Sequence, residues 1–167
     1  NVSQTDEGLL DRFDVPLLEQ LERFLAHMLQ VPLSELPRDK SGDLYVRSGS
    51  AVVFISLVGP PASVVLLSPA VVDVEPTIEL LRFLSDLSGR SPVHYRYHKG
   101  AIVAEMIVMA EPFIGNHVNT ALGTMLGHID DLDDRLAENF GGRRFLDNPT
   151  DTTARRGSEH EELGGYL

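Results

Sequence analysis

One uncharged stretch limits what this chain can fold into. Residues 48–72 contain no charged side chain, although the 167-residue chain has a formal net charge of -11. The stretch is long enough for a membrane-spanning helix, which needs about 20 apolar residues. However, a Gly-Pro-Pro sequence at 59–61 and a further proline, Pro69, interrupt it, and proline removes backbone hydrogen bonds that a helix needs in hydrocarbon. The valines and isoleucines on either side favour strands, so residues 51–58 and 63–67 are predicted to form a β-hairpin rather than a membrane span.

Side chains alternate along the first arm of this hairpin, which assigns them to two faces. One face is uniformly apolar and is predicted to point to the core: Ala51, Val53, Ile55 and Leu57. The opposite face is mixed, as expected for a face that is only partly covered: Val52, Phe54, Ser56 and Val58. Residues 44–47 alternate more clearly, with Leu44 and Val46 against Tyr45 and Arg47, and predict a preceding strand that turns at residues 49–50.

A second hairpin is predicted over residues 92–110, with its turn at His-Lys-Gly, residues 98–100. One face of its two arms is expected to carry Val93, Tyr95, Tyr97, Ile102, Ala104, Met106 and Val108. The other face carries His94, Arg96, His98, Val103, Glu105 and Ile107. This second set again mixes apolar and charged side chains.

Three helices are predicted from apolar residues at helical spacing. The first covers residues 15–30, with Asp14 as its N-cap. The second begins at Pro76 and ends at Gly89, and its predicted stripe is Ile78, Leu81, Leu84 and Leu87. The third covers residues 114–139, and its predicted seam is Val118, Leu122, Met125, Ile129, Leu132 and Leu136. Two glycines in that helix, Gly123 and Gly127, are expected to permit close approach of a neighbouring backbone.

The order of elements predicts an α+β fold, with a single antiparallel sheet covered on one face by helices, in the order α-β-β-β-α-β-β-α. Three parts are expected along the chain: an N-terminal leader at 1–13, a domain at 14–146, and a polar C-terminal tail at 147–167. The segment after the last helix, from Arg143 onward, is polar, rich in turn residues and without periodicity, which is typical of a flexible tail.

Charge and cysteine content exclude several classes of function. The acidic net charge opposes binding to nucleic acid or to an anionic membrane surface, because the basic residues Lys40, Arg47, Arg96 and Lys99 are scattered. The absence of cysteine excludes disulfides and thiolate chemistry and suits a cytoplasmic protein. The start of the chain, NVSQTDEG, has no signal-peptide pattern.

No group of residues predicts catalysis or a cofactor. Four aspartates at 130–134, in the pattern DDLDD, resemble a Mg²⁺-binding motif, but a solvated helix face with an Asp131–Arg135 pair explains them better. Two histidines, His94 and His98, would lie about 13 Å apart along a strand, too far to share a metal ion. Serine-nucleophile and nucleotide-binding motifs are missing from the sequence. We therefore predict a protein that is not an enzyme.

Several local signatures resemble the YbjN-like family, whose actinobacterial members are described as peptide-binding chaperones similar to type III secretion chaperones. The resemblance extends from about residue 17 to residue 145 and is carried by GDLYVRSGSAVVFISLV, VVDVEPTIELLRFLSDLS, HKG, AEPFIG and DDLDDRLAENFGG. Lys99 stands before Gly100 in the hairpin turn, where the family typically has an acidic residue. The resemblance implies a dimeric, chaperone-like module that binds segments of another protein.

The mixed sheet face is the candidate contact surface, because apolar groups rimmed by polar ones mark interaction sites. Its predicted partner-binding residues are Tyr45, Val52, Phe54, Val103 and Ile107. Two hypotheses remain open. The face holds a peptide segment of a partner protein, or it is buried permanently in a homodimer or larger complex, as in a structural or regulatory subunit.

Overall fold

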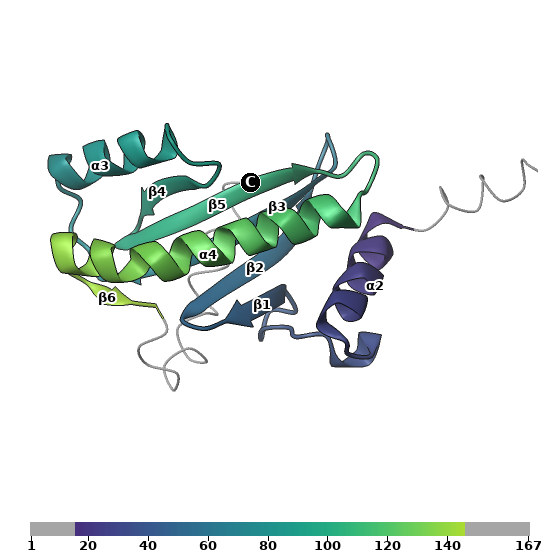
Figure 1. The fold of residues 1–167 in the computed structure, drawn as a ribbon. Helices are drawn as coiled ribbons and strands as arrows, with labels where there is room; N and C mark the ends of the chain where they lie inside the picture. Colours follow the sequence, from purple (N-terminus) through teal and green to yellow (C-terminus); the bar gives the residue numbers. More distant parts are fainter. Residues whose placement is uncertain (1–15, 146–167) are drawn as a thin grey trace, which may run out of the picture.

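The computed structural model describes residues 16–145, which form three α-helices and one antiparallel sheet. The helices are α2 (Leu17–Leu29), α3 (Ile78–Ser88) and α4 (Gly115–Phe140), and a short 3₁₀ helix, η1 (Leu33–Glu35), follows α2. The strands are β1 (Leu44–Ser48), β2 (Ala51–Val58), β3 (Ser63–Val72), β4 (His94–His98), β5 (Ala101–Met109) and β6 (Arg143–Arg144). The predicted α+β fold class and the order α-β-β-β-α-β-β-α are therefore confirmed (Figure 1).

The sheet has the strand order β1-β2-β3-β5-β4, and both predicted hairpins lie in it. Phe54 on β2 pairs with Leu67 on β3, and Val65 on β3 pairs with Ile107 on β5. Side chains at paired positions point to the same face of a sheet. The alternation predicted in each hairpin therefore joins into two continuous apolar surfaces.

A short strand after α4, β6, was missed by the sequence analysis. It pairs with β3 at Val71 and Val72, next to a register shift between Pro69 and Val71. The tail predicted from Arg143 onward therefore starts too early, because Arg143 and Arg144 belong to the sheet. The expected tail at 147–167 and the leader at 1–13 lie outside the described residues.

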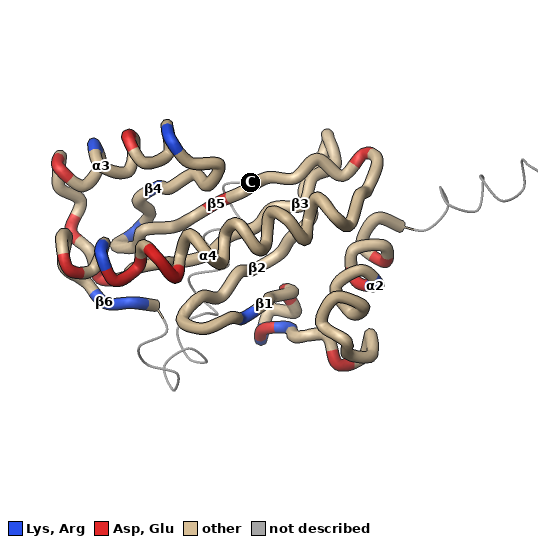
Figure 2. Tube along the Cα trace, viewed as in Figure 1, with Lys and Arg blue, Asp and Glu red and all other residues tan. Residues whose placement is uncertain are grey.

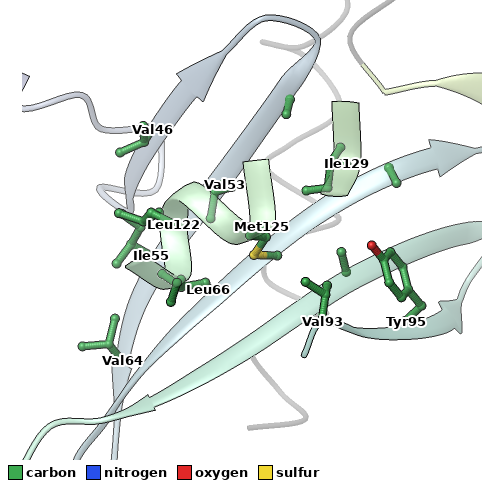
Figure 3. Packing of buried hydrophobic residues seen from close by; sticks show 14 of the residues in the cluster. Val46, Val53, Ile55, Val64, Leu66, Val93, Tyr95, Leu122, Met125 and Ile129 are labelled. Carbon is green, nitrogen blue, oxygen red and sulfur yellow. The ribbon is translucent and has the colours of Figure 1, made fainter. Parts of the chain in front are cut away.

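One long helix, α4, runs along one face of the sheet and closes the main core (Figure 1). Its predicted seam is confirmed: Val118, Leu122, Met125, Ile129, Leu132 and Leu136 are all buried. They meet sheet residues such as Val53, Ile55 and Leu66, which Figure 3 shows around Met125. We call this side of the sheet the helix face.

The other two helices pack at the margins of the sheet. Helix α2 begins at Leu17 after Pro16, and the predicted N-cap Asp14 lies outside the described residues. The ring of Phe24 on α2 meets Phe113 at 6.1 Å between centroids, beside the first residue of α4. Helix α3 lies against β4 (Figure 1).

The predicted stripe of α3 is only half confirmed, because Leu84 is buried and Leu87 packs against the core while its other two residues are exposed, and the predicted role of two glycines in α4 is not found. On α3, Ile78 and Leu81 are 70% and 46% exposed, while Leu80 and Leu84 are buried. The helix packs against the outermost strand, β4, and buries only a narrow face. On α4, Gly123 and Gly127 are exposed, and an added Cβ at either would meet no atom within 4 Å. These glycines therefore have no close neighbour within the described chain.

The uncharged stretch was predicted to form a β-hairpin rather than a membrane span, and it forms β2 and β3. No helix within residues 16–145 is long and apolar enough to cross a membrane.

Candidate functional site: the second face of the sheet

A second apolar cluster lies on the side of the sheet opposite α4. We call it the second face, and its buried residues are Val52, Phe54, Val65, Leu67 and Val103. Helices α2, α3 and α4 bury their apolar residues in the other cluster, on the helix face. The partly buried residues that pack on the second face are Tyr45, Val58, Ala101 and Phe145.

The five predicted partner-binding residues share this face but differ in exposure. Val52, Phe54 and Val103 are buried, being 1%, 6% and 1% exposed. Tyr45 is half-buried, and its ring lies 6.3 Å from that of Phe54. Ile107, in contrast, is 56% exposed. The face is therefore shielded over β2 and open at the far end of β5.

Sequence reasoning missed two residues at the centre of this face, Val65 and Leu67. Alternation along residues 63–67 contains the signal, because it sets both apart from Val64 and Leu66. The pairing of Phe54 with Leu67 then decides the face, and that register becomes known only from the structure.

The border of the second face carries charge. Arg96 on β4 forms an ion pair with Glu105 on β5 at 3.3 Å. Arg47 lies exposed on β1, at the opposite margin of the sheet. A bound segment would therefore meet an apolar centre with polar groups on both sides.

Strand β5 has an open edge beyond the end of β4. Pairing with β4 stops at Glu105, opposite His94, whereas pairing with β3 continues to Met109. Residues 106–109 of β5 therefore lack a strand neighbour on the β4 side among the described residues.

The hydrogen bonds of neighbouring residues show which backbone groups of β5 point to this edge. The backbone N–H of Tyr95 donates to Ser88 Oγ at 2.8 Å, and Ser88 Oγ donates to the Tyr95 carbonyl, so both groups of Tyr95 point away from β5. Backbone direction alternates along antiparallel strands, so Glu105 faces β4, and Ile107 and Met109 face the same side beyond it. The Ala110 N–H donates to the Ala62 carbonyl, on the other side, which agrees with this alternation.

Ile107 and Met109 combine exposed apolar side chains with backbone groups that have no strand partner among the described residues. Met109 is 55% exposed, close to the value for Ile107, and its sulfur accepts a hydrogen bond from Ser63 Oγ at 3.7 Å. An extended peptide laid along this edge could hydrogen-bond to the backbone and bury apolar side chains beside both residues.

The aspartate run on α4 has a structural role. The hydroxyl oxygen Oγ of Ser50, in the β1–β2 turn, lies 2.8 Å from Asp130 Oδ1 and 3.0 Å from Asp133 Oδ2. Asp134 forms an ion pair with Arg144 on β6 at 3.1 Å, and Figure 2 shows this acidic run beside the basic strand β6.

The prediction that all four aspartates are solvated is wrong for Asp133, which is buried, and Asp131 forms no ion pair with Arg135. No group of three His, Asp or Glu side chains within residues 16–145 could hold a metal ion.

Burial raises the pKa of the Asp133 carboxyl group above its ordinary value, and the neighbouring Asp134 adds to the rise. Hydrogen bonds from Ser50 and from the Asp134 backbone, together with Arg144, act in the opposite direction. The hydrogen bond between Ser50 and Asp133 joins α4 to the β1–β2 turn, which is a structural contact.

The family match assigns this domain to a class of peptide-binding chaperones. The chain belongs to the TY-Chap1 family, described as "T3SS (YopN, CesT) and YbjN peptide-binding chaperone 1", whose model matches residues 16–148. The resemblance to YbjN and to type III secretion chaperones is thereby confirmed. The family description names no group of organisms, so the likeness to actinobacterial members stays a prediction.

Two solved structures share the fold. The "ExsC-ExsE Complex" contains a chain with 16% identity and a TM-score of 0.57, and the match covers 72% of this chain and 96% of that one. The Yersinia pestis "type III secretion chaperone SycH in complex with a stable fragment of YscM2" matches at 16% identity and a TM-score of 0.51, over 70% and 99% of the two chains. No curated protein sequence matches this chain.

Proposed function

We propose that this protein is a cytoplasmic chaperone that holds an extended segment of a partner protein against the second face and the open edge of β5. Membership of a peptide-binding chaperone family supports the general function. The observation that carries the location is the coincidence of exposed Ile107 and Met109 side chains with backbone groups that point to an edge without a strand neighbour in residues 16–145.

Strand addition explains how such a site recognises a segment without a fixed sequence. Main-chain hydrogen bonds to the groups of Ile107 and Met109 supply affinity for any extended backbone. Alternate side chains of the segment would lie on the second face, where an apolar residue could contact Ile107 and continue toward Val65 and Val103. Neither step requires a metal or a cofactor.

The proposed site predicts that charge at Ile107 weakens binding. A peptide would be selected on the full chain from a displayed random library and its affinity measured by fluorescence anisotropy. Burying an isoleucine side chain contributes about 1.5–3 kcal/mol, so Ile107→Asp should weaken binding by at least about tenfold. The matched control is Ile78→Asp on α3, since Ile78 is also exposed but lies at the margin of the fold. Equal affinities for the two variants would contradict the location.

A second candidate function uses the same apolar residues. A homodimer that buries Ile107 and Met109 would make the protein a structural or regulatory subunit, and both functions depend on the same hydrophobic driving force. Light scattering across a dilution series separates them. A dimer that never dissociates and loses its stability with Ile107→Asp favours the subunit, whereas an unchanged oligomeric state with loss of peptide binding favours the chaperone.

A further inference from the structure

The second face is buried more deeply than the described chain accounts for. All three described helices bury residues in the cluster on the helix face. Val52, Val65 and Val103 are nevertheless at most 1% exposed. Neighbours within a sheet shield a projecting side chain from its flanks, so burial this deep indicates a further layer above the strands. Among the described residues packed on the second face, Phe145 is the one that lies outside strands β1–β5.

The path of the chain into Phe145 is held by several specific contacts. The Phe145 N–H donates to the Ala70 carbonyl at 3.2 Å, directly after the pairing of β6 with β3. Arg143 forms an ion pair with Asp73 at 2.8 Å, and Arg144 pairs with Asp134. An added Cβ at Gly142 would lie 2.5 Å from the Val72 carbonyl oxygen, so this close approach depends on glycine. These contacts fix the position of Phe145 on the second face.

The segment that follows is long enough to cross the sheet. Residues 146–167, fully extended, would span at most about 75–80 Å. The longest strand, β3, has 10 residues and is roughly 33 Å long. The large apolar residues of the segment are near its two ends: Leu146, Leu163, Tyr166 and Leu167. Its middle is polar, so the apolar C-terminal end is the part suited to an apolar sheet face.

We propose that residues 146–167 fold back over the second face and occupy it in place of a partner segment. The C-terminal segment is then an internal competitor, and a partner peptide binds by displacing it. This inference rests on the proposed function for its regulatory meaning, but the position of the segment can be tested without any partner. The exposed Ile107 is the point where a partner could begin to bind while the segment is still in place.

The position of the segment is tested on the full chain with a spin label. The sequence contains no cysteine, so Ser158→Cys provides a single attachment site for a nitroxide. Paramagnetic broadening of methyl signals is then compared with the reduced, diamagnetic label. We expect selective broadening of Val65, Leu67 and Val103, and little effect on Ile78, which lies on α3. Absence of broadening at those three residues, or equal broadening at Ile78, would overturn the inference.

Competition is tested by replacing the apolar side chains at the end of the segment with charged ones. The variant Leu163→Asp, Tyr166→Asp, Leu167→Asp should bind the library-selected peptide at least several-fold more tightly than the natural chain. The matched control is Thr150→Asp, Thr152→Asp, Thr153→Asp, which adds the same charge to the same segment and should leave the affinity unchanged. Equal affinity of both variants, measured with a peptide that binds the natural chain, would contradict competition.

The two proposals fail in distinguishable ways. If no library peptide binds even the variant with three aspartates at its apolar end, the proposed function is wrong, while selective broadening would still support the folded-back segment. If peptides bind and Ile107→Asp weakens them but no broadening appears, the proposed function stands and the internal competitor is wrong.

Discussion

At the scale of single residues, the buried carboxyl of Asp133 shows how α4 is attached to the sheet. Ser50 Oγ carries one proton and cannot donate to Asp130 and Asp133 at the same time. Ser50 can therefore donate to only one of the two carboxyl groups at a time, and the other is left without that hydrogen bond. Burial is the main cause of the raised pKa of Asp133, so the ionised carboxylate is the costly form at this position.

Replacing Asp133 by asparagine should remove both the buried charge and the competition for the Ser50 proton. The amide can donate to Ser50 Oγ and accept from the Asp134 N–H, which now bonds to Asp133 Oδ1 at 2.7 Å. We expect Asp133→Asn to be at least as stable as the natural chain at neutral pH in urea unfolding. Asp133→Ala should be about 1 kcal/mol less stable, because it leaves polar partners without hydrogen bonds.

The pH dependence of the same variant has a definite sign. A carboxyl whose pKa is raised on folding binds its proton more tightly in the folded state, so stability falls as pH rises from the ordinary range of aspartate through the raised pKa. Asp133→Asn lacks this contribution, so its free energy of unfolding should decline less over that window. A steeper decline in the variant would contradict the assignment.

At the scale of elements, α4 shows that the spacing of residues does not reveal their surroundings. Gly123 and Gly127 lie four residues apart and suggested close helix packing, yet both face open space within the described chain. Glycine in a helix interior costs about 1 kcal/mol relative to alanine. The double variant Gly123→Ala, Gly127→Ala should therefore unfold at higher urea concentration, with a gain of roughly 1–2 kcal/mol. A loss of stability in the same experiment would mean that another surface packs there.

The edge of β5 provides a second prediction at this scale. The N–H of Met109 points away from β3, so Met109→Pro removes no hydrogen bond between these two strands. It does remove a donor that a guest strand would use. We expect peptide affinity to fall while thermal stability changes little. The matched control, Met109→Leu, keeps the N–H and should bind normally, so equal affinity of the proline and leucine variants would argue against strand addition.

Local patterns predicted most of the elements because strand alternation and helix spacing are local properties. The faces of both hairpins and the seam of α4 followed from them. The stripe on α3 followed only in part. Leu84 and Leu87 pack in the core, whereas Ile78 and Leu81, at the same three-residue spacing, are exposed, because the position of β4 decides which side is buried. Strand β6 was missed because two arginines carry no strand pattern, and their pairing depends on β3 and Asp134.

At the scale of the whole molecule, the sheet has two apolar faces with different covers. Sequence alternation predicted the existence of the second face and placed Phe54 and Ile107 on it. It could not predict the contrast in their exposure, because exposure depends on where β4 ends and on where the chain goes after β6. The candidate site is therefore defined by tertiary arrangement more than by any motif.

The central claim is that a partner segment adds as a strand beside Ile107 and Met109. Amide hydrogen exchange of the full chain, measured by NMR with and without saturating library-selected peptide, tests it most directly. The account predicts that the amides of Ile107 and Met109 become protected on binding, because a guest backbone accepts their hydrogen bonds. Unchanged exchange at both amides, together with new protection on α3 or elsewhere, would contradict it.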